Sequence, residues 1–303
     1  MIIGYIKEEN LKPFKGIEIR FFDNNYIIAL AGAKKDKNRI KKKLIKYIQK
    51  LKIDALVFSK ELENFKTSIC EMLGSYNVQV LNGKKLMEFM EFQVVKYVLN
   101  KQKANMKEEE IYIVFKKSSD IDLNFLKKFI EKFRVVNIVT NDVERLKNVQ
   151  DNLLENDGIL ISVSNNKRKA LKRAKYILNI NLNKEELSKY KINRNAIIIN
   201  IREIVKYDSS GFEGININQI KIKCPDEFIE KFEQIGDNFD LVELYESLLF
   251  SDNIQKRKIE DVYDRIDKDD ISITGIIGNN GAISDEELQK IHNLNLDKMR
   301  KLV

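Results

Sequence analysis

The chain has 303 residues, of which 43% are hydrophobic, so it can supply cores for two ordinary domains. Its two cysteines, Cys70 and Cys224, lie far apart and neither has a second cysteine at CxxC spacing, which argues against a disulfide framework and against a zinc site. The single histidine, His292, excludes sites built from several histidines. We therefore expect no metal site.

Lysine and arginine number 54 against 46 aspartates and glutamates, which gives a formal net charge of +8. An acidic partner such as nucleic acid would suit this charge. The alternative is a bias of composition, because Lys, Ile and Asn are frequent along the whole chain. The sequence favours the bias and leaves nucleic acid as the second interpretation.

Neither a membrane span nor a secretory signal is expected. No stretch reaches the roughly 18 uninterrupted apolar residues of a transmembrane helix. The apolar run after Met1, in IIGYIKEEN, is too short and meets charges too early for a signal peptide. These observations predict a cytoplasmic protein.

Strands and helices alternate over the first part of the chain, which predicts a small α/β domain over residues 1–84. A hairpin is expected around the turn DNN, followed by a basic helix with one apolar stripe in KNRIKKKLIKYIQKL. Residues 85–107 contain no glycine or proline and predict a long helix that links this domain to the next.

Residues 108–225 have the most regular pattern, with short apolar segments that are mostly separated by helices of about ten residues. The predicted strands cover residues 111–115, 135–140, 159–164, 176–181, 196–201 and 220–224. This pattern predicts a doubly wound, parallel-sheet Rossmann-like domain in an α/β protein. Residues 226–303 are expected to form a helical C-terminal segment.

The end of the chain allows two interpretations. An Asn-Gly turn followed by a capping box between Ser284 and Glu287 explains the residues around 280. The segment ISDEELQKIHNLNLDKMRKLV also resembles a helix-turn-helix, with Asn295 and Lys298 among the side chains available to contact nucleic acid.

Three stretches resemble the shikimate dehydrogenase-like and amino-acid-dehydrogenase-like group of two-domain proteins. They are VVNIVTNDVERLKNV, AKYILNIN and AIIINI. This resemblance implies a Rossmann domain for NAD(P), with a catalytic lysine and a catalytic aspartate in the substrate domain. Lys60 and Lys66 follow the third strand, but no neighbouring pattern identifies either of them, so no catalytic residue is assigned.

The glycine-rich phosphate loop of that group is missing. Glycines let the chain turn tightly and bring a pyrophosphate close to backbone N–H groups. The corresponding turn here is KKSSDID. Ser118 and Ser119 could donate to a phosphate, whereas helix capping by Ser119 or Asp120 explains the same letters and is favoured.

Two further turns at the carboxyl edge of the predicted sheet carry candidate binding residues. After the second strand, Asn141 or Asp142 could accept a ribose hydroxyl or cap the next helix. After the third strand, Asn165, Asn166 and Lys167 begin a basic helix that could hold a phosphate or be a solvated surface.

Three functions follow as hypotheses. The first is a dehydrogenase-like protein that has lost catalysis and acts as a ligand-binding or protein-interaction module, with a small molecule or nucleotide in the cleft between the domains. The second is an active oxidoreductase with NAD(P) in an atypical site. The third is a nucleic-acid binder that uses the C-terminal helices and the basic faces of residues 34–52 and 167–175.

Overall fold

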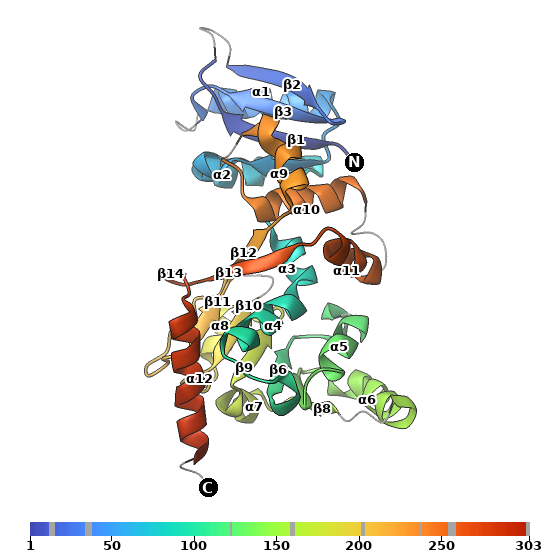
Figure 1. Ribbon diagram of the computed structural model, residues 1–303. Coiled ribbons are helices and arrows are strands. Elements are labelled where there is room, and N and C mark those ends of the chain that lie inside the picture. Colours follow the sequence, from blue (N-terminus) through green and yellow to red (C-terminus); the bar gives the residue numbers. More distant parts are fainter. Residues whose placement is uncertain are drawn as a thin grey trace. The chain divides into compact units, whose positions relative to one another are not determined.

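A computed structural model describes residues 1–11, 16–33, 38–121, 123–157, 161–200, 204–236, 238–253 and 259–300. The chain forms two compact units (Figure 1). Unit 1 contains Met1–Leu86 and Ile222–Ser272, and unit 2 contains Met87–Lys221 and Ile273–Val303. The segment 226–303, predicted as one helical piece, is therefore divided between the two units.

The sheet of unit 1 has the order β2-β3-β1-β4-β5. Its strands are β1 (Ile3–Glu8), β2 (Ile17–Phe22), β3 (Asn25–Leu30), β4 (Ala55–Phe58) and β5 (Gln79–Val80). β2 and β3 pair antiparallel, which confirms the predicted hairpin, and β1, β3, β4 and β5 run parallel. Asp23 and Asn24 form the turn with φ of 45° and 60°, a conformation that Asn and Asp tolerate.

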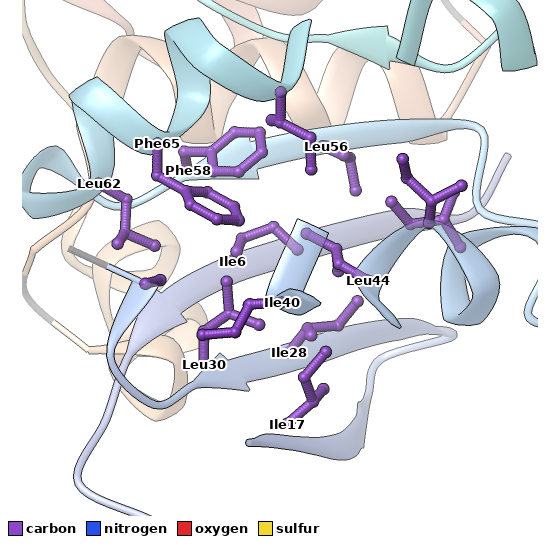
Figure 2. Packing of buried hydrophobic residues seen from close by; sticks show 14 of the residues in the cluster. Ile6, Ile17, Ile28, Leu30, Ile40, Leu44, Leu56, Phe58, Leu62 and Phe65 are labelled. Atoms are coloured by element: carbon purple, nitrogen blue, oxygen red, sulfur yellow. The ribbon is translucent and has the colours of Figure 1, made fainter. Parts of the chain in front are cut away.

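Helices cover both faces of this sheet. α1 (Asn38–Lys50) and α2 (Glu63–Leu73) share one hydrophobic core with strand residues such as Ile6, Ile28 and Phe58 (Figure 2). On the other face, Tyr5 of β1 contacts Phe232 of α9 (Asp226–Phe232), with ring centroids 5.9 Å apart. Tyr5 also hydrogen-bonds Ser247 of α10 (Leu241–Ser251). The described residues of unit 1 also contain α11 (Ile259–Lys268) and the start of α3 (Lys84–Phe89).

The sheet of unit 2 confirms the predicted Rossmann-like fold. Its order is β11-β10-β9-β6-β7-β8, and all pairs are parallel. The strands are β6 (Glu110–Val114), β7 (Val135–Val139), β8 (Ile161–Ser164), β9 (Tyr176–Asn179), β10 (Ile197–Asn200) and β11 (Ile215–Ile217). The first strand is central and the order reverses between β6 and β9, as in a doubly wound sheet.

Burial of whole strands shows that helices cover both faces of this sheet, since every residue of β9 and β10 is buried. α7 (Lys167–Arg173) and α8 (Lys184–Ser188) share a core with β6, β9 and β10. α4 (Glu91–Lys101) and α5 (Leu123–Ile130) pack on each other through Phe92 and Phe129, with ring centroids 5.2 Å apart. α6 (Val143–Asp157) connects β7 to β8.

Two predicted elements differ from the structure. The sixth strand of the Rossmann-like sheet is β11, and not residues 220–224. Those residues lie largely in β12 (Gln219–Lys223), which forms a separate sheet with β13 (Ser272–Gly278) and β14 (Gly281–Ala282). The predicted linking helix 85–107 is two helices, because α3 ends at Phe89 and α4 begins at Glu91.

The C-terminal capping box is confirmed, whereas the helix-turn-helix is wrong. Ser284 N donates to Glu287 Oε2 at 2.7 Å, and Glu287 N donates to Ser284 Oγ at 3.2 Å. The following residues form one helix, α12 (Asp285–Arg300). Its Leu288, Ile291 and Asn295 are buried, so this face packs on unit 2 and Asn295, which donates to Asn195 O, is not available to nucleic acid.

Within the described residues, no helix combines the length and the apolar character needed to span a membrane.

Candidate functional site

The carboxyl edge of the unit 2 sheet is where an open parallel sheet binds its ligand, beside the point where the strand order reverses. The turn after β6 contains a short 3-10 helix, Ser118–Asp120. The turns after β7 and β8 hold the other predicted site residues. The arrangement of these turns decides what the edge can bind.

Carboxylates of the chain itself bind the backbone N–H groups of the β6 turn. Lys117 N donates to Asp120 Oδ2 at 2.8 Å, and Ser118 N donates to Asp142 Oδ2 at 3.0 Å. Ser118 Oγ donates to the same oxygen of Asp142 at 2.6 Å. A dinucleotide phosphate would need N–H groups of this kind, and two of them are already bonded to negative groups.

Asp142 is held as an anion. The Ser118 hydroxyl, together with the Ser118 N–H, lowers the pKa of this carboxyl below its usual range. Its own backbone N–H donates to Thr140 Oγ1 at 3.3 Å, and the Thr140 hydroxyl donates to Lys116 O at 3.0 Å. The turns after β6 and β7 are therefore joined by side chain and backbone together.

A second set of contacts crosses the reversal point, from β6 to the end of β9. Asn181 Nδ2 donates to Asp120 Oδ2 at 2.7 Å, and Lys116 N donates to Asn181 Oδ1 at 3.1 Å. The Lys116 ammonium lies 2.9 Å from Glu186 Oε2. The polar groups of this turn thus bond to one another across the position of a bound pyrophosphate in a dinucleotide-binding domain.

The structure brings Asn141 and Lys167 into contact, whereas the side chain of Asn166 caps a helix. Lys167 Nζ donates to Asn141 Oδ1, and Lys167 is buried, which lowers its pKa. Asn166 caps α7, because its side-chain oxygen accepts from Lys169 N at 3.0 Å. Asn165 is exposed. Ser119 is also exposed and follows Ser118, which is bonded to Asp142. A binding role for the predicted site residues of these three turns stays a prediction.

A row of buried asparagines at the same edge was missed by the sequence analysis. Asn179 Nδ2 donates to Asn200 Oδ1, and Asn200 Nδ2 donates to Asn218 Oδ1, both at 2.9 Å. Asn218 Nδ2 then donates to Asn279 Oδ1 at 2.8 Å. Asn179 and Asn200 are the last residues of β9 and β10, and this repeated position was the available signal. The row joins the ends of β9 and β10 to Asn218, the residue that follows β11.

In unit 1, Lys66 of α2 forms a largely buried ion pair with Glu243 of α10, with Nζ and Oε1 2.8 Å apart. Burial raises the pKa of Glu243 to about 7 although Lys66 acts to lower it. Burial acts to lower the pKa of Lys66, and Glu243 beside it gives a net rise. Lys60, the other lysine considered, is exposed and lies 3.8 Å from Asp240. Neither lysine is shown to be catalytic.

Free thiols and metal ligands add no further site among the residues that the structure describes. Burial raises the pKa of the Cys224 thiol to about 12 and also raises that of Cys70. These thiols are therefore protonated at neutral pH. No group of three or more His, Cys, Asp or Glu side chains in the described ranges has an arrangement that would hold a metal ion.

Comparisons with known proteins give no family. No family model matches the chain, and no curated protein matches it. Among solved structures, aspartate transcarbamoylase from Trypanosoma cruzi in complex with phosphate is 10% identical, with a TM-score of 0.26 over 69% of this chain and 74% of that chain. The ligand-free form of that enzyme is 10% identical, with a TM-score of 0.27 over 69% and 73%. A putative aspartate carbamoyltransferase from the same organism is 13% identical, with a TM-score of 0.24 over 69% and 72%.

These comparisons correct the predicted resemblance. The three solved structures named above are described as transcarbamoylases and not as dehydrogenases, and no family model matches the chain, so the predicted membership of the shikimate dehydrogenase-like group is wrong. The stretches that suggested it, such as AIIINI, are apolar strands that any parallel sheet of this topology needs. TM-scores this low carry no argument about function for the transcarbamoylases either.

Proposed function

We propose that this protein is a non-catalytic binding module, in which the carboxyl edge of a Rossmann-like sheet recognises a ligand or a protein partner without holding a dinucleotide at the β6 turn. The observation that supports this proposal is the pair of carboxylates, Asp120 and Asp142, bonded to the N–H groups of Lys117 and Ser118. No catalytic step is assigned to any residue.

Electrostatics supports the proposal. A pyrophosphate carries negative charge, and placing it beside two carboxylates costs free energy unless they move away. Moving Asp142 away breaks its bonds to the Ser118 N–H and to the Ser118 hydroxyl. Moving Asp120 away breaks its bonds to Lys117 N and to Asn181. A dinucleotide would have to replace all of these contacts.

Rigidity of the edge suits recognition of a partner. The turns after β6, β7 and β9 are held by side-chain bonds through Thr140, Asp142 and Asn181, so their exposed groups have fixed positions. Groups that are already fixed lose little conformational entropy on binding. The exposed polar side chains of these turns include Lys117 and Ser119.

A thermal-shift titration with NAD, NADP and ATP tests the proposal. We expect no rise in the melting temperature of the natural chain at millimolar nucleotide. A ligand present at 100 times its Kd would add about 2.7 kcal/mol to the free energy of unfolding, which such a titration detects easily. A clear rise with NAD or NADP would overturn the proposal and favour an active oxidoreductase.

Two variants with the same change of charge test whether Asp120 and Asp142 exclude an anionic ligand from the β6 turn. Asp120→Asn with Asp142→Asn removes both carboxylate charges and keeps the shape, and we expect this variant to gain stabilisation by NAD or by inorganic pyrophosphate. The control, Asp151→Asn with Glu155→Gln, makes the same change of charge at exposed positions of α6. Equal responses from the two variants would show that the carboxylates of the β6 turn do not exclude the anion.

A further inference from the structure

α1 and the two residues that follow it carry a dense run of positive charge. Residues 38–52, NRIKKKLIKYIQKLK, contain seven basic residues and no acidic one, so of the formal +8 only 8 − 7 = +1 is left for the rest of the chain. The only other described helix with at least four basic residues and no acidic one is α7. The charge of α1 therefore exceeds what a general bias of composition explains.

The basic side chains of α1 are exposed on one side of the helix, because its apolar side is buried. Ile40, Leu44, Ile45 and Ile48 of α1 are buried in the core of unit 1. The exposed basic side chains lie on the opposite side of the helix and are Arg39, Lys42, Lys43, Lys46, Lys50 and, just after the helix, Lys52. Figure 2 labels Ile40 and Leu44 among the packed residues of this core. From residue 39 to residue 50 the helix rises about 16 Å.

The described part of the chain provides no counter-charges for this row. None of the six exposed side chains forms an ion pair there, whereas Lys41 is buried. Like charges stand four residues apart at Arg39 and Lys43, Lys42 and Lys46, and Lys46 and Lys50. Repulsion between such neighbours weakens a helix, so the row is unfavourable in the free protein.

We propose that α1 is a docking surface for double-stranded nucleic acid, and that its lysines and Arg39 bind the phosphate backbone. A duplex carries one negative charge for about every 1.7 Å of its axis with both strands counted, so a length equal to the 16 Å of α1 carries about nine phosphates around its whole circumference. Five exposed positive charges over that length can each contact a phosphate on the side of the duplex that faces α1. Binding would also remove the repulsion within α1.

Features of α1 favour a duplex over a single strand or a membrane. A single strand is held mainly by bases stacked on exposed aromatic rings, and Tyr47, the aromatic residue of α1, packs against the core of unit 1. A helix that lies in a membrane surface inserts an apolar face, and the apolar face of α1 is already buried against the sheet. Lysine contacts to phosphate carry no sequence information, so binding should not depend on base sequence.

The surface proposed here is independent of the β6 turn and of the ligand proposed for it. Of the predicted C-terminal contacts with nucleic acid, Asn295 is unavailable because it donates to Asn195 O, and the side chain of Lys298 lies outside the described residues.

Fluorescence anisotropy with a labelled DNA duplex, measured from 50 to 200 mM salt, tests the proposal. With five phosphates neutralised, the logarithm of affinity should fall with a slope of about −4.5 against the logarithm of salt concentration, which is about 500-fold over this range. Lys42→Gln, Lys43→Gln, Lys46→Gln and Lys50→Gln combined should reduce this slope by about 3.6. The unfolding transition of this variant, followed by circular dichroism, verifies that it is folded.

The matched control removes the same charge from α7, through Arg168→Gln, Lys169→Gln, Lys172→Gln and Arg173→Gln at exposed positions. We expect this variant to keep the slope of the natural chain. Equal losses in the two variants would show that only net charge matters and would overturn the proposal. Binding to vesicles of acidic phospholipid without binding to the duplex would also overturn it, as would tighter binding to a single strand.

Discussion

At the scale of single residues, the chain repeatedly binds its own backbone N–H groups with its own carboxylates. Besides Asp142 on Ser118, Glu8 accepts from Gly32 N at 2.8 Å and from Ala33 N at 2.9 Å. Glu246 accepts from Gly83 N at 2.8 Å and from Lys85 N at 2.7 Å. These N–H groups lie at turns or at a helix start, where external anions bind in other proteins. The internal carboxylates stabilise those turns and reduce their capacity for an anionic ligand.

Glu246 provides the sharpest test of this arrangement. It is 3% exposed and accepts from Asn82, Gly83 and Lys85, and burial raises its pKa against the effect of these bonds. Glu246→Leu leaves buried donors without acceptors, which we expect to lower the free energy of unfolding by roughly 3–5 kcal/mol. Glu246→Gln keeps one acceptor oxygen and should cost roughly 1–3 kcal/mol. Urea denaturation measures both, and equal costs for the two variants would contradict the role of the second oxygen.

Glu243 makes stability depend on pH. Its pKa rises from the ordinary value of 4.5 to about 7 on folding, so between these values the folded chain holds a proton that the unfolded chain has released. The free energy of unfolding should therefore fall as pH rises through this window, since the folded state binds more protons there. We expect Glu243→Gln to flatten the dependence measured by urea denaturation from pH 5 to pH 7. The control is Glu63→Gln, an exposed carboxylate 3.7 Å from the same Lys66, and an equal flattening by it would argue against Glu243.

At the scale of elements, α1 combines good packing with unfavourable surface charge. Four buried isoleucines and leucines attach it to the sheet, while its exposed side repeats lysine at the spacing where like charges repel. A helix selected only for stability would place glutamate at some of these positions. The repeated lysines therefore indicate a requirement other than folding.

Replacement of Lys46 by glutamate should separate stability from binding. The new carboxylate would stand four residues from both Lys42 and Lys50, which converts two repulsive pairs into attractive ones. We expect Lys46→Glu to raise the free energy of unfolding by about 0.5–1 kcal/mol and at the same time to weaken binding to a DNA duplex. Lys46→Gln, which only removes repulsion, should give the smaller gain in stability. A loss of stability in Lys46→Glu would contradict this account of α1.

At the scale of the whole molecule, the chain enters unit 1 twice. Unit 1 is built from Met1–Leu86 and from Ile222–Ser272, which supplies α9 and α10. α9 covers the face of the sheet that contains Tyr5 and Phe22 through ring contacts of Phe232, and α10 contacts the same face through the hydrogen bond between Ser247 and Tyr5. Residues 1–84 alone would therefore expose that face.

Expression of parts of the chain tests this division. We expect residues 1–84 alone to lack a cooperative urea transition, because the aromatic face of the sheet would be open to water. Residues 1–86 joined to 222–272 by a Gly/Ser linker restore the cover and should regain a cooperative transition. A cooperative transition of residues 1–84 by themselves would show that α9 and α10 are not needed.

Local patterns explain which elements could be predicted. The β2–β3 hairpin, the strands β6 to β10 and the Ser284–Glu287 capping box depend on neighbours within a few residues, and the structure confirms them. β11 has three residues and its pairing partner β10 is fixed only by the tertiary fold, so residues 220–224 were wrongly chosen as the sixth strand. The same limit explains α12, whose apolar spacing suits two short helices as well as one.

The sequence by itself determined that this is an α/β protein with a doubly wound parallel sheet and without a glycine-rich turn after β6, because hydrophobic period and glycine content are properties of adjacent residues. Only the tertiary structure decided which groups bind the N–H groups of the β6 turn in place of a phosphate. Asp142 is 24 residues from Ser118 along the chain and reaches it because β6 and β7 are neighbours in a parallel sheet. Tertiary packing likewise decided that α1 presents its charge to solvent, since only burial of its apolar stripe fixes which side remains exposed.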